Sequence, residues 1–178
     1  MGLMPGRDRL CVVQLSPGDG SADVVQIPRW ATDAPNLKSL LLDPNKLKIF
    51  HFARFDLAIL RRSLGVMATP VYCTKIASRL ARTYTDKHGL KDLVREILGV
   101  EVSKQQQLSD WGADKLSDAQ IAYAASDVLH LHALKARLDE MLAREGRERL
   151  AEACFGFLPI RAELDLAGWA GEDIFAHS

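Results

Sequence analysis

The sequence has few cysteines, no net charge and no long apolar run, and each absence removes a class of protein. The three cysteines (Cys11, Cys73 and Cys154) are widely spaced and form no Cys-x-x-Cys pair, which argues against a disulfide framework and against a structural zinc site. No apolar stretch approaches the roughly 18 residues of a membrane span, and the N-terminus lacks the apolar core of a signal peptide. We therefore expect a cytoplasmic protein with no membrane partner.

Charge is balanced overall but unevenly placed. The 23 basic and 23 acidic residues argue against a protein that coats long nucleic acid by charge alone. Between positions 75 and 95, however, two acidic residues face six basic ones, which are Lys75, Arg79, Arg82, Lys87, Lys91 and Arg95. This cluster is either a solvated helix face or a basic patch over a small anionic ligand.

The order of local patterns predicts one α/β domain spanning residues 1–178. Two β-branched runs, 10–15 and 23–27, flank a Ser-Pro-Gly-Asp-Gly-Ser turn and predict a hairpin, and residues 47–51 predict a buried strand. Helical spacing follows over 35–42, 52–64, 74–82 and 90–98, and Gly65 and Gly99 mark two helix ends. Strands followed by interleaved helices indicate a mixed β-sheet flanked by helices.

The C-terminal third predicts one long helix and a tail. Ser117 and Gln120 have the spacing of a capping box, so the helix should begin there. Its apolar row is spaced by three and four residues and comprises Ile121, Ala124, Val128, Leu131, Leu134, Leu138 and Met141. Residues 158–178 keep apolar side chains in a pattern too irregular to predict a helix, and we describe them as a C-terminal tail.

Nucleophilic catalysis finds no support in the sequence. There is no G-x-S-x-G elbow and no glycine-rich phosphate loop. His130 and His132 are two residues apart and would face different sides of a helix, so we interpret them as surface or packing residues.

The acidic residues are more informative. Asp56 lies one turn into an otherwise apolar helix that follows a predicted strand, where an isolated carboxylate is costly unless it is paired, hydrogen-bonded or bound to a metal. Tyr123 and Asp127 are four residues apart and share one helical face. These residues could form an oxygen-rich site for Mg²⁺ or Mn²⁺ and an activated water. Spacing alone favours a simpler interpretation, a helix-terminal aspartate and a solvated pair, because aspartate is common at helix N-termini.

Several motifs resemble a known family. His51-Phe-Ala-Arg-Phe-Asp56 resembles the second motif of the DEDD superfamily of 3′-5′ exonucleases, with His51 in place of the usual asparagine, and Tyr123-Ala-Ala-Ser-Asp127 resembles the third motif in its tyrosine form. The stretch 104–123 is similar to the approach to that motif in ribonuclease D. Longer stretches, including RDRLCVVQLSPGDG and CTKIASRLARTYTDKHGLK, resemble the alphaproteobacterial nanoRNase C oligoribonucleases over nearly the whole chain.

The resemblance implies a ribonuclease H-like exonuclease fold and a two-metal hydrolysis of short single-stranded RNA to nucleoside 5′-monophosphates. It implies Asp56, Tyr123 and Asp127 as catalytic residues, with Asp56 and Asp127 as ligands of two Mg²⁺ or Mn²⁺ ions. The nucleic-acid contacts that we expect are made by Leu3, which would wedge against a base, and by His51, Lys75, Arg79, Arg82, Lys87 and His88. The resemblance further implies a homo-oligomer, with the apolar segment 158–175 as a candidate contact.

One part of the family pattern is not found. The first motif, Asp-x-Glu on the first strand, supplies two of four metal-binding carboxylates in this family, and Met1-Gly2-Leu3 looks like its continuation. We expect either a misassigned start codon or a truncation that removes the first strand. If residues 1–178 are the whole protein, we expect them to be inactive, less stable and prone to association, and an upstream extension through Asp-x-Glu to restore all three properties.

Two other functions stay open. A catalytically inactive module for nucleic-acid binding or assembly would keep the exonuclease fold without its metals, and the missing motif favours it. Trimming of structured tRNA, as in ribonuclease D, would require an accessory domain for which we expect no room in this length.

Overall fold

The N-terminal strands form the hairpin that the sequence predicts. The computed structural model describes residues 9–28, 33–102, 109–113 and 115–177. Strand β1 (Val12–Leu15) pairs antiparallel with β2 (Asp23–Gln26), in a register that places Val12 opposite Gln26. In the turn, Gly18 has a φ of +90°, and a Cβ there would lie 2.8 Å from the ring of His132. Glycine is therefore required by both the backbone and the neighbouring side chain.

The centre of the domain is a parallel strand–helix–strand unit. Strand β3 (Lys48–Phe50) is followed by α2 (Ala53–Leu64) and then by β4 (Val71–Cys73), a strand that the sequence analysis did not predict. β3 and β4 are parallel, with Phe50 opposite Cys73. The described strands thus form one antiparallel and one parallel pair, so both kinds of pairing expected of a mixed sheet are present.

A buried lysine stabilises the entry to this unit. Lys48 is only 9% exposed, and its Nζ donates to the carbonyl oxygens of Asp43 at 2.7 Å, Lys46 at 2.7 Å and Thr69 at 2.5 Å. Three acceptors match the three donors of an ammonium group, which offsets the cost of removing it from water.

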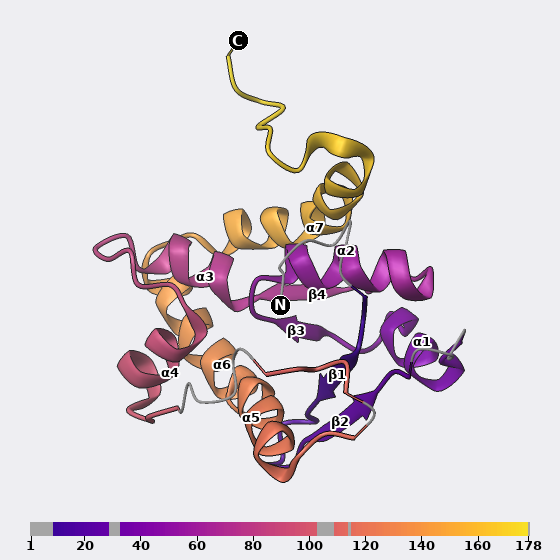
Figure 1. The fold of residues 1–178 in the computed structure, drawn as a ribbon. Coiled ribbons are helices and arrows are strands. Elements are labelled where there is room, and N and C mark those ends of the chain that lie inside the picture. The colour runs from indigo at the N-terminus through magenta and orange to yellow at the C-terminus, as the bar shows by residue number, and fades with distance from the viewer. Residues whose placement is uncertain (1–8, 29–32, 103–108, 114, 178) are drawn as a thin grey trace.

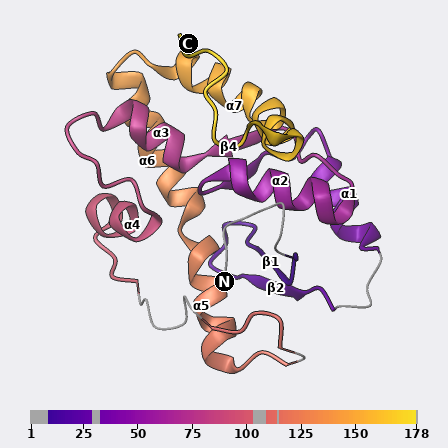
Figure 2. The same ribbon diagram turned by 45° about the horizontal axis from the view of Figure 1, so that its top comes forward.

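Helices cover the strands, as Figures 1 and 2 show. α6 (Leu131–Arg144) contacts β3, α7 (Glu148–Leu164) contacts β4, and α2 contacts both strands and α7. α3 (Thr74–Ala81) packs between α6 and α7, and α4 (Leu90–Leu98) packs on α6. α5 (Asp118–Leu129) lies against the hairpin, while α1 (Pro35–Leu42) follows β2 and buries Leu37 and Leu41.

The long helix predicted from Ser117 is two helices. Its capping box is confirmed, because the Ser117 hydroxyl accepts from the Gln120 N–H and the Gln120 side chain accepts from the Ser117 N–H. The helix breaks at His130, where φ is −99° and ψ is −4°. α5 packs on the hairpin, whereas α6 packs on β3. A single straight helix could not pack on both surfaces. The predicted apolar row is split accordingly: Leu134 and Leu138 are fully buried, whereas Ile121 is 42% exposed.

The expectation that the segment after residue 158 is irregular is wrong for its first part. α7 continues through Pro159 to Leu164 and is followed by a π-helical turn at Asp165–Trp169. Proline removes one helical hydrogen bond, but Phe155, Leu158 and Ala162 are buried against the domain. Burial of each large side chain stabilises by about 1.5–3 kcal/mol, which outweighs the local cost. Beyond Trp169 the chain stays in contact with α7, because Arg161 donates to the Glu172 carbonyl at 3.1 Å and the Phe157 and Phe175 rings lie 6.0 Å apart between centroids.

None of the described helices is long and apolar enough to cross a membrane.

Candidate active site

Asp56 is positioned by the junction between β3 and α2. The chain turns sharply there, because Phe52 adopts a left-handed conformation with φ of 67° and ψ of 45°, which is uncommon for a residue other than glycine. Asp56 follows in the first turn of α2, where the helix dipole favours a negative charge. Non-glycine residues in this conformation gather at functional sites, and here the turn brings the carboxylate to the C-terminal edge of the parallel strands.

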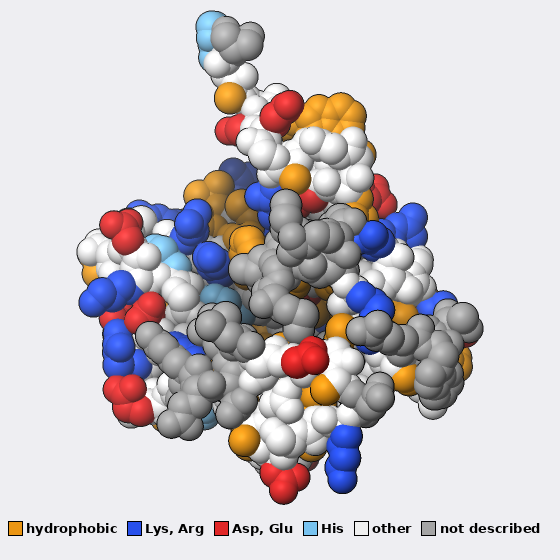
Figure 3. Space-filling model, in the orientation of Figure 1, with side chains coloured by type: hydrophobic (Ala, Val, Ile, Leu, Met, Phe, Trp, Pro, Cys, Tyr) orange, Lys and Arg blue, Asp and Glu red, His pale blue; other side chains and the backbone are white. Residues whose placement is uncertain are grey.

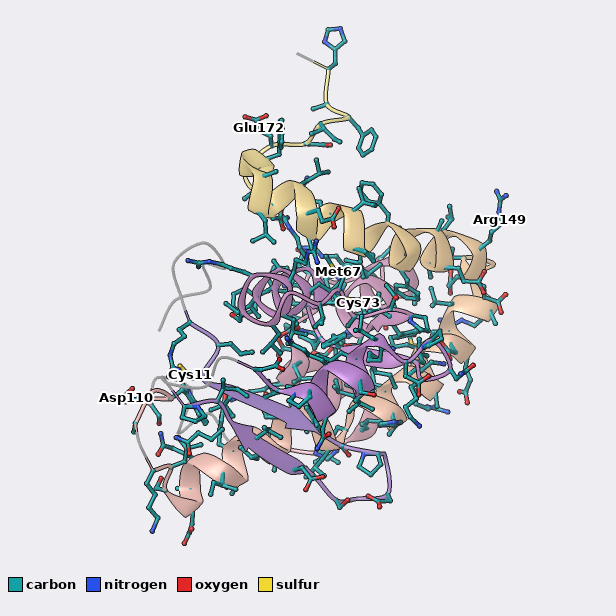
Figure 4. The ribbon with its side chains drawn as sticks, turned by 90° about the vertical axis from the view of Figure 1, so that its right-hand side faces the viewer. Cys11, Met67, Cys73, Asp110, Arg149 and Glu172 are labelled. Carbon is teal, nitrogen blue, oxygen red and sulfur yellow. The ribbon has the colours of Figure 1, made fainter. Side chains whose placement is uncertain are left out.

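Tyr123 and Asp127 are positioned by α5. They lie one turn apart on the same side of the helix, and the ring of Tyr123 is in contact with Trp111, at 6.0 Å between ring centroids. The loop that carries Trp111 packs on the start of the hairpin, where Asp110 and Cys11 lie close together in Figure 4. Gln26 Nε2 also donates to the Ala113 carbonyl at 2.6 Å.

The structure brings the three predicted catalytic residues together. A cleft of about 1130 Å³ is lined by Asp56, Tyr123 and Asp127, and also by His51. Its walls come from the hairpin, α1, β3, α2, the start of α4, α5 and the first turn of α6. Asp56 and Tyr123 therefore share one concave surface, although they are 67 positions apart in the chain.

Burial raises the pKa of both carboxyl groups. The pKa of Asp56 rises from 3.8 to about 7, chiefly because the group is removed from water. The pKa of Asp127 rises to about 6 for the same reason, against the opposing effect of the Lys91 charge. Burial and the negative charge of Asp127 also raise the pKa of the Tyr123 phenol. Two desolvated carboxyl groups that face one cleft gain most from a bound cation, which restores their ionised form.

His51 joins the two strand ends. Its Nδ1 lies 2.9 Å from the hydroxyl of Thr74, and that hydroxyl donates to the Phe50 carbonyl at 3.2 Å. If the Thr74 hydroxyl donates to Phe50, it accepts from His51 Nδ1–H, and Nε2 is then the acceptor nitrogen of the neutral ring. Burial and the charge of Lys75 lower the pKa of His51 to about 4, so the ring is neutral at pH 7.

The predicted phosphate-contacting residues lie beside the cleft and do not line it. Lys75 and Arg79 are on α3, and Lys87 and His88 are in the segment that leads to α4. Lys75 Nζ lies 4.4 Å from the centroid of the Phe52 ring, and His88 Nδ1 lies 2.8 Å from the Ser78 hydroxyl. In Figure 3, Lys and Arg side chains gather, together with acidic ones, over the region of α3 and α4.

Arg82 differs from its neighbours because the structure buries it. It is 2% exposed, forms an ion pair with Glu96 and donates to the Lys87 carbonyl at 3.0 Å. Its guanidinium therefore ties α3 to the following loop and to α4, and it is not presented to a substrate. The prediction that Arg82 contacts phosphate is therefore corrected, because its guanidinium is buried. Leu3 lies outside the described residues.

Two residues of the site were not assigned to it from the sequence. Lys91, counted only as part of the basic stretch, lines the cleft, and its Nζ is 4.9 Å from the centroid of the Tyr123 ring. Trp111 contacts the same ring. The four-residue spacing that identifies Tyr123 and Asp127 carries no information about α4, so no local signal pointed to Lys91.

The comparisons with known proteins identify the family of this chain. The profile of a family described as 3′-5′ exonuclease matches residues 1–143. Ribonuclease D of Gluconacetobacter diazotrophicus is 41% identical over 138 residues, which are 78% of this chain and 35% of that protein. DNA polymerase I of Aquifex aeolicus is 40% identical over 99 residues, which are 56% of this chain and 17% of that protein. The chain belongs to the 3′-5′ exonuclease family, and it spans about a third of the length of the curated ribonuclease D relatives.

Solved structures narrow the resemblance within that family. Brucella melitensis NrnC with bound Mg²⁺ is 62% identical with a TM-score of 0.95, over 99% of this chain and 86% of that one. The same protein bound to pGG is 63% identical with a TM-score of 0.96 over the same shares. Escherichia coli RNase D is 26% identical with a TM-score of 0.77, over 88% of this chain and 42% of that one. The expected exonuclease fold and the resemblance to nanoRNase C are confirmed.

The donor chemistry of the cleft fits a hard divalent cation. Asp56 and Asp127 provide carboxylate oxygens, the ligands that Mg²⁺ and Mn²⁺ prefer. Within the described ranges, no group of three or more His, Cys, Asp or Glu side chains is placed to hold a metal. Two carboxylates are thus the part of the ligand set that these residues contribute.

Proposed function

We propose that the chain is a metal-dependent 3′-5′ exoribonuclease that hydrolyses very short RNA to nucleoside 5′-monophosphates. The convergence of Asp56 from α2 with Tyr123 and Asp127 from α5 on one cleft carries the proposal. Membership in the 3′-5′ exonuclease family supports the reaction, and the Brucella melitensis NrnC structures with Mg²⁺ and with pGG support the metal and a substrate of two nucleotides.

Asp56 and Asp127 would hold the metal, with two Mg²⁺ or Mn²⁺ ions in the complete site. When bound, such ions lower the pKa of a coordinated water and stabilise negative charge on the scissile phosphate and on the leaving oxygen. The oxygen of water then forms a bond to phosphorus as the bond from phosphorus to the 3′-oxygen breaks. The 3′-oxygen takes a proton, and the terminal nucleotide leaves with its phosphate on the 5′ side.

Tyr123 contributes through its hydroxyl. The phenol keeps its proton at pH 7, because burial and Asp127 raise its pKa, so it can both donate and accept a hydrogen bond. We assign it to holding the attacking water in line with the scissile bond. Groups that position or deprotonate a nucleophile are typically worth ~10²- to 10⁴-fold in rate.

The size and surroundings of the cleft favour short substrates. Its volume of about 1130 Å³ is that of a small-ligand site rather than of a surface for folded RNA. Lys75, Arg79, Lys87 and His88 lie along one side and are proposed to contact backbone phosphates, which orient a nucleic acid without reading its sequence. Leu3 as a wedge against a base, and a direct contact from His51, remain proposals that rest on the family resemblance.

Competition between short and long RNA tests the substrate. Labelled pGG and a labelled structured RNA are mixed with the protein and Mn²⁺, and the decay of both is followed in one reaction. We expect pGG to be consumed first and EDTA to stop its decay. Preference for the structured RNA would support the ribonuclease D interpretation instead.

A second candidate function is a catalytically inactive module that binds nucleic acid or supports assembly. The observation that favours it is the absence of a third metal-binding side chain among the described residues. Purified protein that binds pGG but never releases a mononucleotide, at any Mn²⁺ concentration, would establish this alternative.

The exposed apolar side chains of the C-terminal segment are the candidate surface for self-association. Apolar side chains on α7 and beyond it are exposed, namely Phe157, Ile160, Trp169, Ile174 and Phe175, and Figure 3 shows hydrophobic atoms gathered on this part of the surface. We propose that they form a contact between copies of the chain. Sedimentation velocity of Ile160→Asp, compared with Glu163→Asp, should then show loss of the oligomer only in the first variant.

The three free cysteines fit a reducing cytoplasm.

A further inference from the structure

Lys91 places a positive charge inside the cleft from a helix that neither exonuclease motif includes. It is the second residue of α4, next to Gly89 and Leu90, which also line the cleft. Its Nζ lies 4.9 Å from the centroid of the Tyr123 ring, within the range of a cation–π contact. Tyr123 is thus contacted by Lys91 from α4 and by Trp111 from the loop before α5.

The charge of Lys91 also acts on Asp127, which lies one turn beyond Tyr123. Its effect on the pKa of Asp127 is to lower it, opposite to the effect of burial. Lys91 therefore carries its charge beside both residues of the tyrosine motif, and its contact with the Tyr123 ring is the geometry that fixes its place.

We propose that Lys91 is a positioning residue for hydrolysis, which holds the Tyr123 ring so that its hydroxyl meets the attacking water. This inference rests on the proposed exonuclease function. It distinguishes Lys91 from the basic residues Lys75, Arg79, Lys87 and His88, which lie beside the cleft and are assigned to substrate phosphates.

The chain contains a matched control for this arrangement. Lys135 on α6 lies 5.0 Å from the centroid of the Tyr72 ring and pairs with Asp139 at 2.6 Å. The same three residue types therefore meet in a second place, which lines a different pocket from the catalytic cleft. Replacement of Lys135 removes an equivalent set of contacts without touching the proposed site.

The experiment compares Lys91→Met, Lys91→Arg and Lys135→Met with the wild type. Hydrolysis of pGG with Mn²⁺ gives kcat and KM, and thermal unfolding gives the melting temperature. For Lys91→Met we expect kcat to fall about tenfold with KM within twofold and an unchanged melting temperature, because the Tyr123 hydroxyl is misplaced while substrate binding is kept. Lys91→Arg should keep most of the rate, and Lys135→Met should match the wild type in both measurements.

A double-mutant cycle with Tyr123→Phe separates positioning from substrate binding. Without the phenolic hydroxyl there is nothing left for Lys91 to orient, so Lys91→Met should cost less than twofold in kcat in the Tyr123→Phe background. A rise in KM with unchanged kcat, persisting in that background, would show that Lys91 binds phosphate and would overturn the proposal. A lower melting temperature, with a loss of rate that persists in the Tyr123→Phe background, would assign Lys91 a merely structural role and overturn the proposal.

Failure of the proposed function gives a different result. If the wild type releases no mononucleotide, the exonuclease assignment is wrong and the inference about Lys91 falls with it. If the wild type is active and Lys91→Met matches it in kcat, only the inference about Lys91 is overturned.

Discussion

The imidazole Nδ1 of His51 and the hydroxyl of Thr74 lie 2.9 Å apart, and this hydrogen bond joins the C-terminal ends of the two parallel strands. It connects the turn before Asp56 to the first residue of α3. The carboxyl ends of parallel strands are where ligands bind in α/β domains, so a bond at this edge aligns the side of the cleft that carries Asp56.

Removal of this bond should lower both stability and rate. Thr74 is fully buried, and Thr74→Val removes the partner of His51 Nδ1 and one donor to the Phe50 carbonyl, which we expect to cost ~1–3 kcal/mol of unfolding free energy. Urea unfolding measures the loss, and pGG turnover should slow with it. Thr83→Val, at an exposed position in the loop before α4, is the control and should stay within about 0.5 kcal/mol of the wild type. Equal midpoints for the two variants would show that the bond contributes nothing.

Substitutions in the tyrosine motif should separate substrate binding from the chemical step. We expect Asp127→Ala to abolish hydrolysis, because it removes a metal ligand, and Tyr123→Phe to keep substrate binding while slowing the chemical step by ~10²-fold or more. Single-turnover decay of a labelled dinucleotide with Mn²⁺ measures the rate, and equilibrium binding measures the affinity. Wild-type rates in both variants would exclude these residues from catalysis.

The raised pKa of Asp56 makes stability depend on pH in a defined direction. An aspartate in the unfolded chain titrates near 3.8, whereas folded Asp56 titrates at about 7, so between these values the folded state binds more protons. Stability of the metal-free protein therefore falls as pH rises from about 4 to about 7 and is level above that range. Asp56→Asn removes this loss and should be more stable than the wild type at pH 8 by on the order of 2–4 kcal/mol.

Chemical unfolding of both proteins at several pH values checks this prediction. His51 contributes in the opposite direction between about 4 and 6.5, because the unfolded imidazole takes up a proton that the folded one does not. That contribution is present in both proteins and cancels in their difference. A difference in stability that does not change with pH would show that Asp56 is ordinarily ionised in the fold. Addition of Mn²⁺ at pH 8 should stabilise the wild type and not Asp56→Asn.

Two arginines of α3 should respond differently to the same substitution. Arg82→Met leaves Glu96 without its buried partner and should destabilise the protein by ~2–4 kcal/mol, since Glu96 keeps some contact with water. Arg79→Met, at an exposed position, should leave stability unchanged and raise KM for pGG if it contacts phosphate. Thermal unfolding and steady-state kinetics of both variants test the pair. An unchanged melting temperature for Arg82→Met would return Arg82 to the candidate phosphate contacts.

Local signals in the sequence determined much of the architecture. The hairpin, α1, α2 with its end at Gly65, α4 with its end at Gly99 and the capping box of α5 all depend on residues within a few positions of one another. The same holds for Asp56, Tyr123 and Asp127 as candidates, because each motif, 51–56 and 123–127, is a short run of consecutive residues. Propensity, caps and spacing act over one or two turns, so they can be read along the chain.

Only the tertiary structure decided the features that depend on distant contacts. The break at His130 arises because α5 and α6 lie on different surfaces, and α7 passes through Pro159 because its buried face outweighs one lost hydrogen bond. The sequence does not distinguish Arg82 from its neighbour Arg79. Only packing buries Arg82 and places it against Glu96. Lys91 reaches Tyr123 across 32 positions of the chain, and no periodicity within α4 specifies that approach. Burial and charge pairing depend on which elements meet in space, and that is settled only when the whole domain folds.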